Sequence, residues 1–198
     1  MKNLEEIRME QASRLHRQIW RGHPKQKPAF AEYVKTIPRL LPATGGSRLF
    51  TIPVLVDGRV SLPRCYIQFR VDRKSPHPIF VDYQGILVPK VYWIWCNDGK
   101  HLYDTSPREY RKSFGENVIG LSEREGLAFH AQYPSVARNR FIDLPGSVLV
   151  EDDTSVACIG PWTGYKGGKV WLHYINEEER HPRCRSASRI LARIQTEG

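Results

Sequence analysis

Basic side chains stand beside aromatic rings at two places in the chain, a combination typical of surfaces that bind phosphate. Near the amino terminus, three arginines surround Trp20, and a glycine-rich segment in the carboxyl-terminal half brings Tyr165 close to two lysines. Arginine and lysine neutralise phosphates, and aromatic rings stack on unpaired bases. The first hypothesis is therefore binding of nucleic acid, or of another anionic partner such as an acidic protein. The candidate residues are Arg14, Arg17, Trp20, Arg21, Tyr165, Lys166 and Lys169.

The distribution of charge supports this hypothesis. The chain has 30 lysines and arginines against 21 acidic residues, a formal charge of +9. Positive charge is concentrated at both ends, from Met1 to Arg48 and from Arg180 onward. Clustered positive charge attracts anions over about a Debye length, roughly 10 Å at moderate salt.

A second set of residues is compatible with chemistry on NAD. Arg70 stands at the end of a predicted strand, Ser106 closes Asp104-Thr105-Ser106, and Glu179 closes a run of three glutamates. This order resembles the motifs of toxin-type ADP-ribosyltransferases. The resemblance implies that Arg70 contacts the NAD diphosphate through paired hydrogen bonds and that Glu179 stabilises an oxocarbenium-like transition state. The alternative hypothesis is thus an NAD-dependent transferase using Arg70, Ser106 and Glu179.

These three residues also have structural interpretations. Arg70 and Asp72 point to the same face of a strand and can pair at the surface. Ser106 precedes Pro107 and stands three residues before Glu109, which is the pattern of a helix-capping box. The glutamate run is then a solvated charged stretch.

Other constellations are weaker. A small-molecule pocket lined by tryptophans is a third functional class, and its candidates are Trp93, Trp95, Trp162 and Trp171. Cys96 and His101 could form a nucleophilic pair across a turn, although core packing is the alternative for both kinds of residue. His181 and Cys184 have ligand spacing, but zinc takes about four ligands and no second pair follows. The sequence predicts no metal site, and no cofactor except NAD under the transferase hypothesis.

Three stretches between Val91 and Ser188 share a pattern with a known family. The first stretch runs from Tyr92 through Asp98-Gly99 to Glu109. The second is Leu121 to Ala128, followed by Gln132-Tyr133-Pro134. The third begins at Leu144-Pro145-Gly146-Ser147 and continues through Trp162 and Trp171 to Arg183–Ser188. Together they resemble an uncharacterised bacterial family, domain of unknown function 5701. The resemblance implies one fold across the second half of the chain and carries no activity.

The helices and strands that position these residues can be predicted from the spacing of apolar residues and from turn and capping residues. Apolar residues at helical spacing predict a helix from Leu4 to Gly22 and a shorter one over Phe30 to Leu41. Asp-Gly turns predict two hairpins, Arg48–Val56 with Arg59–Val71 and Val91–Cys96 with His101–Tyr103. Capping boxes at Ser106 and Ser122 predict helices. The remaining predicted elements are strands at Pro78–Tyr83, Arg140–Leu144, Ser147–Val150, Ser155–Ile159 and Lys169–Ile175, and a helix over Ser186–Ile194.

The expected fold is one α+β domain over residues 1–198, with a helical arm at 1–44 and a core at 45–198. The core is expected to be an antiparallel, hairpin-built sheet with an inserted helix. The amino terminus lacks a secretory pattern, and the longest apolar stretches fall far short of the roughly 18 residues that span a bilayer. Four widely spaced cysteines suggest no disulfide framework. We therefore expect a cytoplasmic bacterial protein with no membrane partner.

Overall fold

The computed structural model describes residues 3–21, 24–40, 50–73, 80–82, 90–97, 99, 104–114, 118–151, 154–161, 170–180 and 184–190. The helices are α1 (Leu4–Ile19), the 3₁₀ helix η1 (Pro24–Gln26), α2 (Phe30–Lys35), α3 (Leu62–Phe69), α4 (Pro107–Lys112), α5 (Glu123–Gln132) and α6 (Pro134–Asn139). The strands are β1 (Ile52–Asp57), β2 (Val71–Arg73), β3 (Phe80–Asp82), β4 (Val91–Cys96), β5 (Val118–Gly120), β6 (Phe141–Leu149), β7 (Ser155–Pro161), β8 (Val170–Asn176), β9 (Cys184–Ser186) and β10 (Ser188–Ile190).

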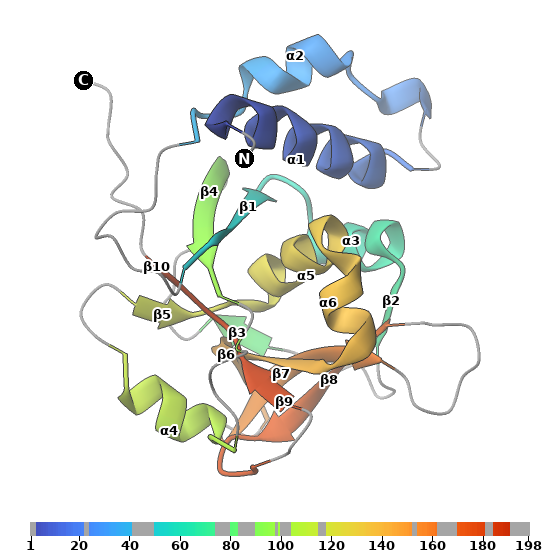
Figure 1. The fold of residues 1–198 in the computed structure, drawn as a ribbon. Coiled ribbons are helices and arrows are strands. Elements are labelled where there is room, and N and C mark those ends of the chain that lie inside the picture. Colours follow the sequence, from blue (N-terminus) through green and yellow to red (C-terminus); the bar gives the residue numbers. More distant parts are fainter. Residues whose placement is uncertain are drawn as a thin grey trace.

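The described strands form two mostly antiparallel sheets, and the fold is α+β with an N-terminal helix, as predicted. One sheet has the order β1-β4-β10-β5, so β4 lies between β1 and β10. The other has the order β2-β8-β7-β6-β3, and β9 also pairs with β6. In Figure 1, α1 and α2 lie above the first sheet, and the second sheet lies below α5.

The two sheets meet where the segment after β5 crosses a bend in β6. Gly146 donates its backbone N–H to the carbonyl of Leu121 at 3.0 Å. A Cβ on Gly120 would lie 2.5 Å from the Gly146 nitrogen, closer than real Cβ contacts come. Glycine is therefore required at this crossing, because the opposing atoms belong to backbone rather than to a mobile side chain.

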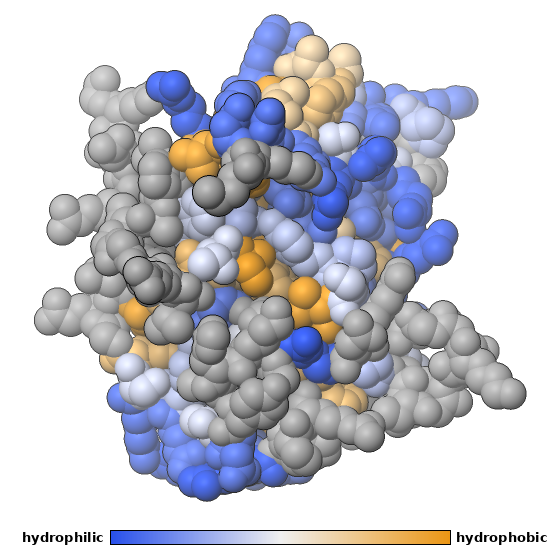
Figure 2. Space-filling model, viewed as in Figure 1, coloured by the Kyte–Doolittle hydropathy of each residue, from blue (hydrophilic) through white to orange (hydrophobic). Residues whose placement is uncertain are grey.

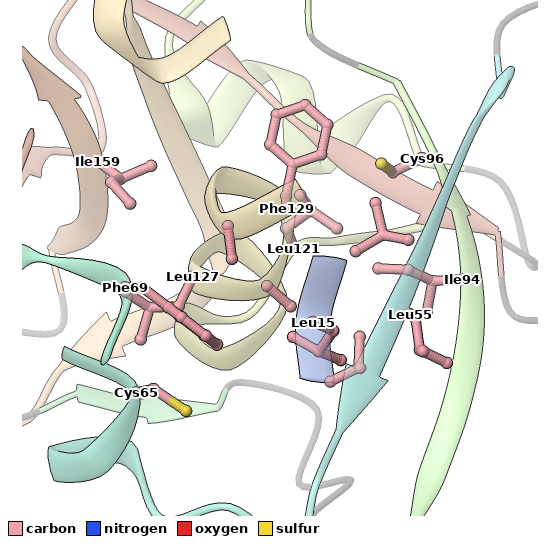
Figure 3. Packing of buried hydrophobic residues seen from close by; sticks show 14 of the residues in the cluster. Leu15, Leu55, Cys65, Phe69, Ile94, Cys96, Leu121, Leu127, Phe129 and Ile159 are labelled. Carbon is pink, nitrogen blue, oxygen red and sulfur yellow. The ribbon is translucent and has the colours of Figure 1, made fainter. Parts of the chain in front are cut away.

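Helix α5 is the centre of the hydrophobic core. Its residues Leu127 and Phe129 are fully buried, and Figure 3 shows Phe69 of α3 beside Leu127. Leu55 of β1 and Leu15 of α1 belong to the same cluster. The apolar side of α1 thus packs against the core that α5 and the first sheet form.

Both predicted capping boxes are confirmed. Ser106 begins α4 and Ser122 begins α5, and each serine exchanges hydrogen bonds with the glutamate three residues on. The predicted strand at Pro78–Tyr83 corresponds to β3, and the later predicted strands correspond to β6, β7 and β8.

Two predicted elements are wrong. The Asp57-Gly58 turn leads into α3 rather than into a strand, so β1 pairs with β4 instead of with residues 59–71. The apolar spacing of Leu62, Cys65, Tyr66 and Phe69 is helical, and Pro63 in the first turn favours a helix. At the other end, the predicted Ser186–Ile194 helix is replaced by the end of β9 and by β10; residues 191–198 lie outside the described residues.

The second strand of the second predicted hairpin, residues 101–103, lies outside the described residues. Its first strand is confirmed as β4. Within the described part of the chain, the neighbours of β4 are β1 and β10, and both pair with it in antiparallel orientation.

Candidate anion-binding surface

Four exposed cations lie at the carboxyl-terminal end of α1 and on the segment that follows it. Arg17 is in the last turn of α1, Arg21 is two residues beyond its end, Lys25 belongs to η1, and Lys27 directly follows η1. None of the four makes an ion pair with a described residue. We call Arg17, Arg21, Lys25 and Lys27 the basic surface. Figure 2 shows hydrophilic residues over the upper right of the molecule, where α1 and η1 lie in Figure 1.

His16 holds the segment after η1 against α1. Its Nε2 lies 3.0 Å from the carbonyl oxygen of Pro28, and its ring contacts Phe30 and Tyr33. Burial lowers the pKa of His16 below 6.5, and the charge of Lys27 lowers it further, against the hydrogen bond to Pro28. Lys27 directly precedes Pro28, so this contact holds the segment that carries Lys27 next to α1.

Negative charge on α1 is concentrated at its other end. Glu5 and Glu6 occupy the first turn, and Glu6 is roughly 16 Å along the helix from Arg17. Glu10 pairs with Arg14 at 2.8 Å. No acidic side chain of α1 therefore offsets the charge of the basic surface.

Arg14, which the sequence assigns to the same site, holds two helices together. Its Nη1 donates to the carbonyl oxygen of Gln132 at 2.6 Å, and its Nη2 pairs with Glu10. Gln132 is the last residue of α5, and the last carbonyls of a helix have no partner within it. Arg14 thus caps α5, and its guanidinium is engaged within the protein.

Trp20, the predicted stacking residue, is half-buried rather than exposed. It packs against the hydrophobic core, and the guanidinium carbon of Arg64 lies 4.5 Å from its ring centroid. Arg64 therefore covers one face of the indole. Arg64 is not among the predicted binding residues, because the Asp57-Gly58 turn predicts a strand over residues 59–71. The helix-start pattern Ser61-Leu62-Pro63 is the local signal that places Arg64 in a first helical turn.

The remaining predicted binding residues, Tyr165, Lys166 and Lys169, lie outside the described residues.

The residues of the transferase hypothesis lie at two ends of the second sheet. Arg70 is exposed and ends α3 with a left-handed backbone (φ 58°), so it is not at the end of a strand. The next residue, Val71, pairs with Val170 at the start of β8. Glu179 follows the end of β8, roughly 20 Å along the strand from that pair. Figure 1 shows α3 and α4 on different sides of the molecule.

Ser106 and the glutamate run lie at the same end of the second sheet, and each has a structural role there. Ser106 is buried and caps α4. The N–H of Arg108 donates to the carbonyl oxygen of Glu177 at 2.9 Å, and the Arg108 side chain pairs with Glu177 and Glu178. The run anchors α4 to the end of β8, while Glu179 itself is exposed.

The other candidates divide between the core and the parts that are not described. Trp93 is buried and donates its indole N–H to the carbonyl oxygen of Pro38 at 2.9 Å. Trp93 is on β4 and Trp171 is on β8, so the two tryptophans belong to different sheets. Trp162, His101 and His181 lie outside the described residues, as does the side chain of Cys184. Cys96 is fully buried, with its Sγ 3.4 Å from the carbonyl oxygen of Ile52.

Among the described residues, no three His, Cys, Asp or Glu side chains are placed to hold a metal ion. No helix within the same residues has the length and apolar character needed to cross a membrane. Comparison of the chain with family models, curated proteins and solved structures found no match. The two family resemblances therefore remain predictions.

Proposed function

We propose that this protein binds nucleic acid through the phosphate backbone, and that the basic surface makes the contact. The observation that carries the proposal is the set of four exposed cations with no acidic partner among the described residues. Each such cation can release a counterion when it neutralises a phosphate. The overall charge of +9 adds long-range attraction.

The surroundings of Trp20 favour phosphate contacts over base stacking. A base needs an open aromatic face, and Arg64 covers one face of Trp20 while the core contacts the residue from elsewhere. Contacts limited to the backbone discriminate little between sequences. We therefore expect binding with weak sequence preference and strong dependence on salt.

The test is a salt-resolved titration of labelled single- and double-stranded oligonucleotides with the whole protein. In the Arg17→Gln/Arg21→Gln variant, the slope of log affinity against log salt is expected to become shallower by up to about 2, because two fewer phosphates are neutralised. Affinity at low salt falls with it. Arg14 stays unchanged in this variant because it caps α5.

A matched control removes two exposed cations outside the arm, Lys90 and Lys112, by Lys→Gln substitution. It changes the net charge by the same amount as the first variant. The proposal requires that the control keep a steeper salt slope than Arg17→Gln/Arg21→Gln. Equal slopes in the two variants would mean that the charge acts generally, and no binding by the parent protein at physiological salt would reject the proposal.

A further inference from the structure

Arg64 carries an unused hydrogen-bonding edge. Its Nε and Nη2 are both buried, and neither makes a hydrogen bond with any described residue. These two nitrogens lie on one side of the planar guanidinium, and their N–H groups point in parallel. An arginine uses such an edge to hold two oxygens of one carboxylate or phosphate.

The same chain shows an arginine edge in use. Arg59 donates from Nε to Oδ1 of Asp57 at 2.8 Å and from Nη2 to Oδ2 at 2.7 Å. Arg64 presents the corresponding pair of nitrogens without any oxygen opposite them in the described structure.

Trp20 lies against the guanidinium of Arg64, whose central carbon is 4.5 Å from the centroid of the indole ring. A guanidinium stacked on an indole keeps all its N–H groups in its own plane, away from the ring that it covers. The indole Nε1 of Trp20 is also buried without a hydrogen bond to the described residues. Three N–H donors of two side chains in contact thus lack an acceptor among the described residues, in the region where α1 packs against α3.

The surroundings favour an anion with several oxygens. Arg64 is in the first turn of α3, where the helix dipole is positive, and the capping residue Ser61 makes no side-chain hydrogen bond to the helix. Arg17 is three residues before Trp20 on α1, so it lies on the adjoining part of the helix surface. Trp20 and Arg64 are half-buried as whole residues, whereas the three donor nitrogens are themselves buried.

We propose that Arg64 and Trp20 form a binding site for one phosphate group. The edge of Arg64 binds two phosphate oxygens, Trp20 fixes the guanidinium and adds a third donor, and Arg17 supplies charge at the rim. The phosphate belongs to a nucleic acid, in line with the proposed function above, or to a free phosphate or small phosphate ester. The chemistry is the same in both cases, and the experiment separates them.

The experiment follows the indole N–H signals of the whole ¹⁵N-labelled protein by NMR during titration with inorganic phosphate. The Trp20 signal is identified by its loss in Trp20→Phe. We expect this signal to shift with saturation under phosphate and not under sodium chloride of equal ionic strength. Arg64→Lys keeps the charge but loses the paired edge, and should weaken phosphate binding roughly tenfold or more.

Arg39→Lys is the matched control, since Arg39 is exposed on the arm and lies outside both proposed sites. It should bind phosphate as the parent protein does. The proposal is overturned if the Trp20 signal responds equally to phosphate and chloride, or if Arg64→Lys and Arg39→Lys bind phosphate with the same affinity. The titration of the parent protein decides the question even if Arg64→Lys does not fold.

A second titration uses a short oligonucleotide. If it also shifts the Trp20 signal, and Arg64→Lys weakens it, the natural occupant is a backbone phosphate. If only inorganic phosphate shifts the signal, the site is one for free phosphate or small esters. Oligonucleotide binding that depends on Arg17 and Arg21 but leaves Trp20 unshifted in both titrations would reject this site and keep the proposed function.

Discussion

Glu123 is an acidic residue in a buried environment. It is the first residue of α5 and only 3% exposed, and its Oε1 makes no hydrogen bond with the described residues. Its backbone N–H donates to Ser147 at 2.7 Å. Burial raises the pKa of Glu123 to about 7, although the charge of Arg124 acts in the opposite direction.

This raised pKa gives the stability of the fold a defined pH dependence. The folded protein holds the Glu123 proton up to about pH 7, whereas the unfolded chain releases it near 4.5. Between these values the folded state binds more protons, so the contribution of Glu123 to stability falls as pH rises. We therefore compare the free energies of unfolding of Glu123→Gln and the parent protein. Their difference, variant minus parent, should increase by up to about 3 kcal/mol from about pH 4 to about pH 8.

Urea unfolding at several pH values measures this difference. Glu151→Gln removes an exposed carboxylate and is the control, with no comparable growth expected. A constant difference between Glu123→Gln and the parent across the range would show that Glu123 is ionised in the folded protein.

At the scale of elements, polar side chains of α1 and α5 complete hydrogen bonds that neighbouring elements leave open. Gln18 and Arg14 of α1 donate to the carbonyls of Ala131 and Gln132, the last two residues of α5. The side-chain amide of Gln132 in turn bonds both the N–H and the C=O of Leu55 on β1. This contact satisfies the backbone of Leu55 and protects the strand from pairing with another chain.

Removal of the Arg14 side chain should therefore destabilise the fold more than removal of Arg17. Arg14→Ala leaves the Gln132 carbonyl without its charged donor, at a cost of about 1 to 3 kcal/mol. Arg17→Ala removes an exposed side chain from the same helix and should change stability by about 0.5 kcal/mol or less. Chemical denaturation of both variants compares them, and equal losses would show that the contact with α5 contributes little.

The sequence predicts the elements whose signals are local. Ser106 and Ser122 mark helix starts correctly, because a capping box is complete within four residues. The helical spacing from Leu62 to Phe69 is an equally local signal, and it competes with the hairpin that the Asp57-Gly58 turn predicts. In the structure, this turn connects β1 to α3 rather than closing a hairpin. The Asp57 carboxylate binds Arg59 and accepts a hydrogen bond from Tyr33, which ties the turn to α2.

Strand β10 could not be predicted, since long-range contacts determine it. Arg189 is almost fully buried and pairs with Glu125 at 2.7 Å, 64 positions earlier in the chain. Ser188 is fully buried in hydrogen bonds with Asn97 and Tyr110. A sequence with Ser and Arg at these positions looks like an exposed helix until these partners are known.

At the scale of the whole molecule, the candidate site could be predicted only where its residues are close together in the sequence. Arg17 and Arg21 could be predicted to be neighbours because they are only four residues apart in the chain, at the end of one predicted helix. The stacking of Arg64 on Trp20 depends on how α3 packs against α1, and the separation of Arg70 from Glu179 depends on the pairing of β2 with β8. No local pattern contains either relation.

The arm shares its apolar contacts with the rest of the molecule. Leu15 and Ile19 of α1 are 1% exposed and belong to the cluster that includes Leu55 and Leu127. A helix that contributes to the same core should unfold with it. We therefore expect the arm and the core to form one cooperative unit, as the prediction of a single domain requires.

Leu15→Ala tests this expectation. The loss of a fully buried leucine side chain should cost about 2 to 5 kcal/mol. If the arm and the core unfold together, amide hydrogen exchange in α1, β1 and β4 should accelerate by the same factor, because all three open through the same global transition. Met9→Ala removes a more exposed apolar side chain from the same helix and should have a much smaller effect. Faster exchange confined to α1, with β1 and β4 unchanged, would show instead that the arm opens alone, and the basic surface could then detach from the core while it binds.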